Sequence, residues 1–387
     1  MERLVVSERA DWRELAAKLG FRFHSPGGTV YWDESACYRF TLEEIERDLE
    51  APTEEVHELC MDLVSRAVHD EDYLRRLAIP EPFWEYVRSS YLRGDPHIYG
   101  RMDLAYDGHG PAKLYELNYD TPTSLYEAAV FQWVWLRQQI ERGALPADSD
   151  QFNSVHEKLL LAFYMIARKV GGLMHFASVR DSEEDRATVD YLTDLAYQAG
   201  IKTQYLAIED IGRTADGRYT DCADRVIDTI FKLYPWEFMF AEEFAPLLAT
   251  SGATWLEPPW KAILSNKGAL ALLWELHPGH PNLLETYFEE STSLSLPCGW
   301  VRKPLLSREG ANVEILTDQG QHIEAPGPYG DSPYVRQKFH PLPKFGDSYA
   351  LIGSWVIGDR AAGTGIREDH SLITQDTARF VPHLVVS

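Results

Sequence analysis

YGRMDLAYDGHGPAKLYELNYDTPTSLYE, residues 99–127, is the stretch around which the rest of the chain is organised. It holds two segments in which apolar and polar residues alternate, RMDLAY at 101–106 and KLYELNY at 113–119. The intervening DGHGP, at 107–111, is rich in glycine and proline and suits a tight turn better than a helix. The pattern therefore predicts a β-hairpin.

Polar side chains share a face on each strand of this predicted hairpin. Because alternate residues of a strand point the same way, Arg101 lies beside Asp103, and Glu116 lies beside Asn118. When the two strands pair, the four groups converge. Two carboxylates and an amide oxygen next to an arginine can hold Mg²⁺ against phosphate. The same spacing is equally typical of the wet face of an amphipathic hairpin.

Composition narrows the possible partners. The chain has 387 residues, of which 45% are hydrophobic, enough for two or three subdomains around a sizeable core. Its net charge of −23 argues against nonspecific binding to nucleic acid or to an anionic membrane, since both need a basic surface. A cationic partner such as a polyamine would be attracted instead.

Cysteine usage and hydropathy indicate the compartment. The four cysteines are scattered without metal-ligand spacing or a disulfide framework, which fits a reduced cytosol. No apolar run reaches the ~18 residues that span a bilayer, and MERLVVSERADW lacks the basic and apolar regions of a signal peptide. We expect a cytoplasmic protein.

The first hundred residues are predicted to be mostly helical from residue 8 onward. Thr41, followed three residues later by Glu44, forms a capping-box pattern at one helix start. The YWDE loop at 31–34 could supply Trp32 and two carboxylates to a site, but an aromatic in a loop is more often a packing anchor.

The middle of the chain changes rhythm. Residues 124–143 are typical of a long helix that buries Phe131, Trp133 and Trp135. Strand and helix patterns then alternate over about 174–232, which predicts a small parallel βαβ layer. The acidic turn at 181–185 follows its first strand, where such layers place ligands, although acidic residues are also good helix caps.

The last third, about 255–387, is predicted to be rich in antiparallel strands. Lys267 precedes a helix, Lys303 lies on a strand, and the following SREG loop could lay backbone amides of Gly310 over phosphates. Strands are expected over 332–339, 348–358 and 364–374, with Arg367, Glu368 and Asp369 exposed at the end of this meander. Together with the distant carboxylates, this ordered set describes an ATP-grasp site.

The chain resembles the glutathionylspermidine synthetase family. Six motifs carry the resemblance along essentially the whole chain: YWDE at 31–34, RMDLAYDG at 101–108, YELNYDTPTS at 115–124, PWKAILSNK at 259–267, RKPLLSREGANV at 302–313 and GSWVIGDRAAGTGIRED at 353–369. Only the synthetase half matches. The amidase domain of the bifunctional members, with its catalytic cysteine, has no room in this chain.

The resemblance implies a mixed α/β (α+β) fold of the ATP-grasp type. It would comprise an N-terminal helical region, the βαβ layer and a C-terminal antiparallel sheet, with about 255–387 supplying the ATP-binding lid and sheet of a single catalytic unit over 1–387. The implied activity is ATP-dependent ligation of a carboxylate to an amine, with ATP and Mg²⁺ as cofactors. The implied substrates are a glutathione-like acid and a polyamine-like amine.

The resemblance also implies residue roles. Arg101 and Arg367 would be catalytic, stabilising the transferring phosphoryl group from two sides. Mg²⁺ would be held by Asp103, Glu116 and Asn118. The ATP site would comprise Arg101, Asp103, Lys267, Lys303, Glu309, Gly310, Gln337, Lys338, Phe339 and Leu372. The acid substrate would meet Thr121, Thr123 and Ser124, although such hydroxyls are equally typical of a turn before a helix.

Two other functions stay open at this point. The chain could bind nucleotide without ligase activity and act through a partner. Alternatively, Asp103 and Glu116 could be the acid pair of a hydrolase, a hypothesis that leaves the lysines and the glycine loop without a role.

Overall fold

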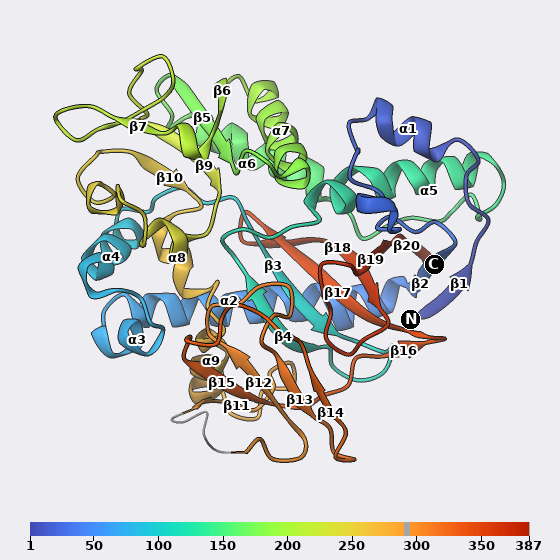
Figure 1. The fold of residues 1–387 in the computed structure, drawn as a ribbon. Helices are drawn as coiled ribbons and strands as arrows, with labels where there is room; N and C mark the ends of the chain where they lie inside the picture. The colour runs from blue at the N-terminus through green and yellow to red at the C-terminus, as the bar shows by residue number, and fades with distance from the viewer. Residues whose placement is uncertain (290–294, 387) are drawn as a thin grey trace.

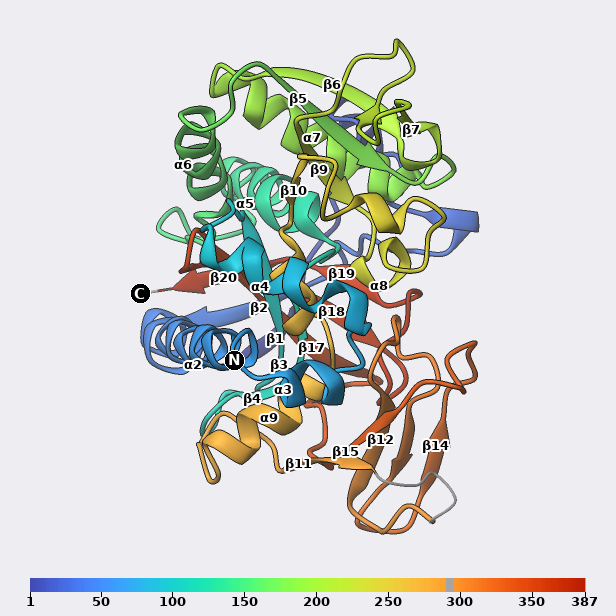
Figure 2. The same cartoon turned by 90° about the vertical axis from the view of Figure 1, so that its left-hand side faces the viewer.

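The computed structural model describes residues 1–289 and 295–386. Its elements form three tiers, with a parallel sheet at one end, an antiparallel sheet in the middle and a second antiparallel sheet at the other end (Figures 1 and 2). The mixed α/β class predicted from the sequence is confirmed. No helix in the described part of the chain is long and apolar enough to cross a membrane.

The middle tier is a six-stranded antiparallel sheet built around the predicted hairpin. Its strand order is β19-β18-β17-β3-β4, with β16 pairing β17. The bounds are β3 (Tyr99–Ala105), β4 (Lys113–Asn118), β16 (Lys344–Phe345), β17 (Ser348–Ile357), β18 (Arg360–Asp369) and β19 (Arg379–Val381). Strand β18 lies four or five residues upstream of the expected 364–374, because Gly358 and Asp359 form a tight turn directly after β17.

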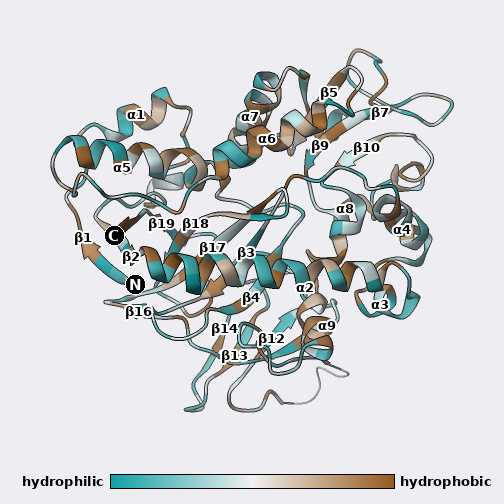
Figure 3. Ribbon diagram, turned by 180° about the vertical axis from the view of Figure 1, so that it is seen from behind, coloured by the Kyte–Doolittle hydropathy of each residue, from teal (hydrophilic) through white to brown (hydrophobic). Residues whose placement is uncertain are grey.

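One face of this sheet is covered by the long helix α2 (Ala51–Ala67), which runs along the back of the molecule (Figure 3). The hydroxyls of Thr53 on α2 and Ser354 on β17 lie 2.7 Å apart and are buried. Ser354 pairs with Met102, whereas Arg101 and Asp103 alternate to the opposite face. The apolar face of β3 therefore packs on the side of α2, and its polar face, which carries Arg101 and Asp103, points to the opposite side.

The parallel tier has the order β10-β9-β5-β6, with every neighbouring pair parallel. Its strands are β5 (Leu173–Ser178), β6 (Lys202–Ala207), β9 (Thr229–Leu233) and β10 (Thr254–Leu256), and its helices are α6 (Val155–Ala167) and α7 (Glu183–Gln198). The short hairpin β7 (Gly212–Arg213) and β8 (Tyr219–Thr220) lies in the β6 to β9 crossover. Strand β10 extends this layer beyond the predicted range of 174–232.

The third tier is a five-stranded antiparallel sheet with the order β11-β15-β12-β13-β14. Its bounds are β11 (Thr286–Glu289), β12 (Trp300–Pro304), β13 (Glu314–Leu316), β14 (His322–Glu324) and β15 (Tyr334–Lys338). Helix α9 (Gly268–Leu276) packs against β11 and β15 and also contacts β4 of the middle sheet. This tier, which we call the lid sheet, is thereby positioned over the polar end of β4.

The N-terminal region joins the two chain ends. Strands β1 (Glu2–Val5) and β2 (Ala36–Thr41) form a sheet with β20 (His383–Val386), so the termini lie near each other (Figure 1). The remaining α-helices are α1 (Trp12–Lys18), α3 (Glu71–Arg76), α4 (Trp84–Leu92), α5 (Gln132–Glu141) and α8 (Trp236–Met239). The π-helical and 3₁₀ segments are η1 (Pro26–Gly28), η2 (Glu44–Glu50), η3 (Glu81–Phe83), η4 (Glu127–Phe131), η5 (Ile208–Asp210), η6 (Ala245–Leu247) and η7 (Pro259–Ile263).

Of three predictions about single residues or caps, the structure confirms one and contradicts two. The capping box is confirmed, since the amide of Thr41 donates to Glu44 Oε2 at 2.8 Å and the amide of Glu44 donates to Thr41 Oγ1 at 3.2 Å. The prediction that Trp133 is buried is wrong, because it is 39% exposed and faces away from the core that encloses Trp135. The expected exposure of Glu368 is also wrong. Its carboxylate is fully buried and accepts from Arg3, Tyr38 and Arg379, which tie β18 to the N-terminal sheet.

Candidate active site

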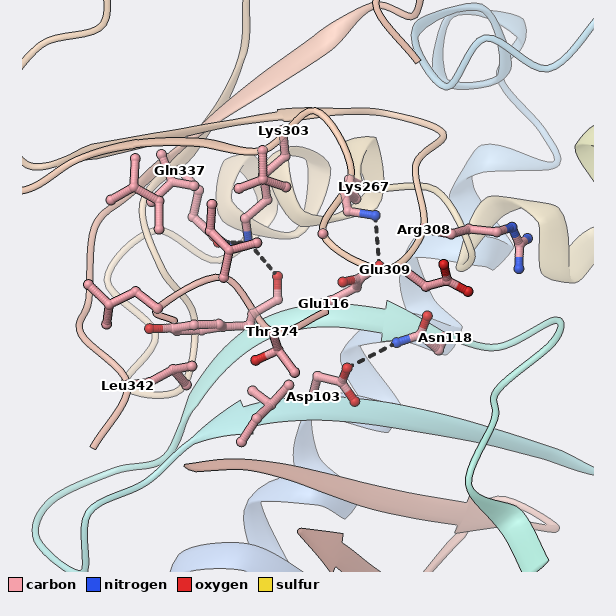
Figure 4. Close-up of a pocket in the computed structure, with 18 of the residues that line it drawn as sticks. Asp103, Glu116, Asn118, Lys267, Lys303, Arg308, Glu309, Gln337, Leu342 and Thr374 are labelled. Atoms are coloured by element: carbon pink, nitrogen blue, oxygen red, sulfur yellow. Dashed lines mark hydrogen bonds and ion pairs between the residues drawn. The ribbon is translucent and has the colours of Figure 1, made fainter. Parts of the chain in front are cut away.

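Strands β3 and β4 form the floor of a pocket. Antiparallel pairing places Asp103 opposite Glu116 and Arg101 opposite Asn118, as the hairpin pattern predicts. A bulge after Asp103 shifts the register beyond that point, and the Nδ2 of Asn118 lies 3.5 Å from Asp103 Oδ2 (Figure 4). Two carboxylates and one amide therefore lie on a single patch of sheet.

Two arginines hold Asp103 from different strands. Arg101 donates from Nε at 2.7 Å and from Nη2 at 3.1 Å, while Arg367 on β18 donates from Nη2 at 2.9 Å. Burial alone would raise the pKa of Asp103, but the charges of Arg101 and Arg367 outweigh it and hold this pKa below its usual value. Asp103 is thus a stable carboxylate next to two cations.

Two buried lysines face the floor from the lid side (Figure 4). Lys267, at the start of α9, donates to Glu116 Oε1 at 2.7 Å and to the Ser307 carbonyl at 2.6 Å. Lys303, on β12, donates to Gln337 Oε1 at 2.7 Å and to the Tyr115 carbonyl at 3.0 Å. Burial lowers the pKa of Lys303 to about 8.

The loop after β12 closes one side of the pocket. Gly310 has a φ of +71°, and a Cβ there would meet Ile373 Cγ2 at 2.5 Å and the Thr374 carbonyl at 2.9 Å, so only glycine fits. On the same loop, Arg308 donates to Thr121 Oγ1 and to Glu237 Oε1, each at 2.8 Å. The loop therefore contacts both the chain that follows β4 and the chain that follows β18.

The structure brings almost all the predicted site residues to this one pocket. Its lining includes Arg101, Asp103, Glu116, Asn118, Thr121, Thr123, Lys267, Lys303, Glu309, Gly310, Gln337, Lys338, Phe339, Arg367 and Leu372. Ser124 is the exception and corrects the prediction, because it does not line the pocket and its buried hydroxyl lies 3.0 Å from the hydroxyl of Tyr31. Thr123 is the last residue of this segment that lines the pocket, and the side chain of Ser124 points away from it toward Tyr31.

Several lining residues were not predicted. Arg308 belongs to the quoted SREG motif, so a basic residue beside a glycine loop was the available signal. The apolar residues come from separated strands and loops and have no common motif: Leu284, Val301, Val313, Ile315, Leu342, Leu351 and Ile373. Val301, Val313, Ile315 and Ile373 cluster with Phe339 on the lid side, and Leu342 and Leu351 cluster with Tyr115 on the side of the middle sheet. Two facing apolar groups of this kind suit a flat aromatic ring.

Comparison with known proteins agrees with this geometry. A family model described as glutathionylspermidine synthase preATP-grasp matches residues 3–386. The chain belongs to the glutathionylspermidine synthase family. The resemblance drawn from the sequence motifs is thus confirmed.

Curated relatives place the chain within this family. It is 40% identical over 393 residues, 98% of each chain, to a Haemophilus influenzae protein named as an acid–amine ligase. It is 30% identical to trypanothione synthetase of Crithidia fasciculata, covering 83% of this chain and 52% of that one. It is 26% identical to the bifunctional glutathionylspermidine synthetase/amidase of Escherichia coli, covering 97% and 63%. The chain therefore spans about half to two thirds of these two larger relatives.

A solved structure supports the fold. A glutathione synthetase-like effector from Globodera pallida superposes with a TM-score of 0.57 at 12% identity, and the match covers 98% of both chains. At this identity, the likeness shows a shared fold and nothing about substrate.

The metal ligands that the family resemblance implies fit the chemistry of the floor. Within residues 1–289 and 295–386, no three His, Cys, Asp or Glu side chains gather as a metal site, so the set depends on the amide of Asn118 as its third member. Two carboxylates and an amide oxygen are donors that suit Mg²⁺, which also keeps waters and phosphate oxygens in its shell.

Acidic side chains lie near the pocket without lining it. Glu184 and Asp185, in the first turn of α7, are half-buried. Burial, with Glu127 and Asp185 close by, raises the pKa of Glu184 to about 8, and the charges of Arg367 and Glu309 in the pocket lining also act on it. The helix-cap interpretation of this turn holds, because Ser182 Oγ accepts from the amide of Asp185 at 3.1 Å.

Proposed function

We propose that this chain is an ATP-dependent ligase that joins a carboxylic acid to an amine through an acyl phosphate. The observation that carries the proposal is the meeting of Asp103, Glu116 and Asn118 with Lys267 and Lys303 across one pocket. Oxygen ligands on the floor and cations on the lid side are what a bound triphosphate requires. The names of the family relatives support the same chemistry.

The proposed residue roles follow from position. Lys267 and Lys303 would bind the ATP phosphates, and Gln337, Lys338 and Phe339 would receive the adenine at the apolar end. Asp103, Glu116 and Asn118 would hold Mg²⁺, which when bound neutralises phosphate charge. Further contacts to ATP would come from Glu309, Gly310 and Leu372.

Attack of a carboxylate on the γ-phosphate brings two anions together, so positive charge must be placed beforehand. Arg101 and Arg367 supply it from β3 and β18, and both are already oriented by Asp103. Closure of the 307–310 loop would exclude water, which protects the acyl phosphate from hydrolysis.

The substrates would approach from the end opposite the adenine. Thr121, Thr123 and Arg308 would receive the acid, because they offer two hydroxyls and a guanidinium beside the floor. Asp185 and Glu309 would attract the ammonium of the amine, and Glu184, which its pKa of about 8 leaves mostly protonated at pH 7, would ionise once that cation lies beside it. A glutathione-like peptide and a polyamine-like amine are the substrates we propose.

The hydrolase alternative is disfavoured by the environment of Asp103. A glycosidase-type pair needs one carboxyl that stays protonated near neutral pH. The two arginines hold the pKa of Asp103 below its usual value, and Lys267 pairs with Glu116. Neither carboxyl is arranged to act as an acid.

The test is ADP release with Mg²⁺ and ATP, with glutathione and spermidine together or singly omitted, followed by mass analysis of the product. We expect a condensed product that needs both substrates and is lost in Glu116→Ala. The matched control is Glu324→Ala, an exposed glutamate on β14 of the lid sheet, which should retain full turnover.

Other outcomes separate the alternatives. ADP release with different acids or amines would keep the mechanism and change the substrates. Measurable ATP binding without ADP release under any combination would replace the ligase with a nucleotide-binding protein.

A further inference from the structure

Tyr31, in the N-terminal loop, lies behind the proposed active site without lining the pocket. We infer that Tyr31 is a positioning residue that sets the direction of the Arg101 guanidinium through Ser124 and the carbonyl of Thr123. This inference rests on the proposed function for its kinetic consequence. Its structural basis has three parts: the buried hydrogen bonds that join the Tyr31 hydroxyl to Glu127 and Ser124, the peptide bond between Ser124 and Thr123, and the hydrogen bond from Arg101 to the Thr123 carbonyl.

The Tyr31 hydroxyl makes two hydrogen bonds. It donates to Glu127 Oε1 and lies 3.0 Å from Ser124 Oγ, in a bond for which either oxygen can be the donor. Burial raises the pKa of Tyr31 well above its ordinary value, so the hydroxyl keeps its proton. All three side chains are buried, so water does not replace these bonds.

Ser124 is held in an uncommon backbone conformation. Its φ is +65°, in the left-handed region that residues with a side chain rarely adopt. A residue persists there when its surroundings over-determine it. The bond to Tyr31 is such a constraint, and the amide of Ala128, donating to the Ser124 carbonyl at 3.2 Å, is a second one.

The φ of Ser124 determines where the preceding carbonyl points. The Thr123 carbonyl belongs to the peptide plane that joins Thr123 to Ser124, so rotation about the Ser124 φ turns it directly. That carbonyl accepts from Arg101 Nη1 at 2.7 Å, while Nε and Nη2 of Arg101 each donate to Asp103. Because the Arg101 guanidinium is bonded to Asp103 on one side and to the Thr123 carbonyl on the other, its orientation is fixed before a phosphate binds.

Tyr31 is itself tied to the second arginine. Its carbonyl accepts from the amide of Phe380 at 2.6 Å, and Phe380 on β19 pairs with Arg367 on β18. Tyr31 therefore links the strand that carries Arg367 to the turn that holds Arg101. The N-terminal loop has a defined task in the site, although it contributes nothing to the pocket surface.

The test compares Tyr31→Phe with Tyr126→Phe. Tyr126 is as buried as Tyr31, at 9% exposed, and its hydroxyl donates to the Leu19 carbonyl at 2.7 Å, away from the arginines. Tyr126→Phe loses one hydrogen bond and Tyr31→Phe loses two, so both should lower the melting temperature and Tyr31→Phe should lower it more. Only Tyr31→Phe should lower kcat, by about tenfold to a hundredfold, with KM for ATP within about twofold of the wild type.

A rescue variant isolates the backbone mechanism. Glycine adopts the left-handed conformation without steric penalty, so Tyr31→Phe combined with Ser124→Gly should recover part of the lost kcat. Ser124→Ala, which removes the hydroxyl that contacts Tyr31, gives the same kinetic test if Tyr31→Phe does not fold. A kcat for Tyr31→Phe equal to that of Tyr126→Phe would overturn the inference.

Crystal structures of the wild type and Tyr31→Phe separate this inference from the proposed function. We expect the variant to lose the bond between Arg101 and the Thr123 carbonyl and to show a changed φ at Ser124. An unmoved Arg101 overturns the positioning role, whether or not the protein releases ADP. Conversely, a wild type that releases no ADP contradicts the ligase and leaves the structural comparison decisive for Tyr31.

Discussion

Lys303 shows how the surroundings of one side chain change its chemistry. Its ammonium is buried and donates to two neutral acceptors, the Gln337 amide oxygen and the Tyr115 carbonyl. Burial lowers its pKa to about 8, while the more distant charge of Glu116 opposes the shift. In the nucleotide-free protein, Lys303 is therefore charged at pH 7 and mostly neutral at pH 9.

We predict that ATP affinity falls as the pH rises above 8. Phosphate oxygens favour the charged lysine, so binding at pH 9 must first restore a proton, which weakens affinity by up to about tenfold per pH unit. Lys303→Arg, which stays charged, should abolish this fall between pH 7 and 9. Calorimetric titration with ATP at pH 7, 8 and 9 measures the ATP affinity of each protein. Lys344→Arg, at an exposed lysine on β16, is the control, and equal pH profiles in all three proteins would contradict the prediction.

At the scale of elements, the 307–310 loop connects the lid sheet to the floor. Arg308 contacts Thr121 and Glu237, while Gly310 packs against Ile373 and Thr374. These contacts come from three separate segments, namely the chain after β4, helix α8 and the chain after β18. The loop can therefore close only when its backbone approaches the segment after β18 closely.

Gly310→Ala should weaken ATP binding by about tenfold or more, because a Cβ would meet Ile373 and the Thr374 carbonyl and hold the loop open. Gly320→Ala is a matched control. Gly320 has a similar φ of +81° but no atom within 4 Å of an added Cβ. It should lose stability by roughly 1–2 kcal/mol from backbone strain and keep its ATP affinity. Equal affinities for both variants, measured by equilibrium binding, would show that loop closure does not depend on this contact.

The whole molecule combines a strongly acidic surface with a pocket that gathers its cations internally. The net charge is −23, yet Arg101, Arg367, Lys267 and Lys303 meet around one small space. In the proposed ligase, the acidic field would attract a cationic amine over a distance of about one Debye length, ~10 Å at 0.1 M salt. The local cations would bind the anionic phosphates.

KM for a triamine such as spermidine should therefore rise with ionic strength. We expect roughly a threefold or larger increase between 30 and 300 mM NaCl, because salt screens the long-range attraction. KM for a monoamine substrate should change less, since its charge is smaller. Steady-state ADP release measures both. A salt dependence that is the same for both amines would show that surface charge does not contribute to amine capture.

Part of the site could be predicted because its determinants are local. A period of two over 101–106 and 113–119 is sufficient to place Arg101, Asp103, Glu116 and Asn118 on one face, and the pairing register matches. The capping box at Thr41 is equally local. Such patterns depend only on residues a few positions apart, so the amino-acid sequence alone is enough to predict them.

Whether a particular side chain is buried or exposed is decided by tertiary structure. Tryptophan is usually a core residue, but Trp133 is exposed. Glutamate is usually a surface residue, but Glu368 is buried and bonded to Arg3, Tyr38 and Arg379. Ser124 lies in the expected segment yet turns toward Tyr31. Each outcome depends on a partner distant in sequence, and no local period encodes which partner that is.

The sequence alone determined the chemical groups, their order and the face of β3 that carries them. Only the tertiary structure decided that Arg367 would reach Asp103 from a strand 264 residues away, that the lid loop would dock through Arg308, and that an N-terminal tyrosine would brace the site from behind. The physical reason is that alternation along a strand follows from backbone geometry, whereas contacts between strands follow from the packing of the entire chain.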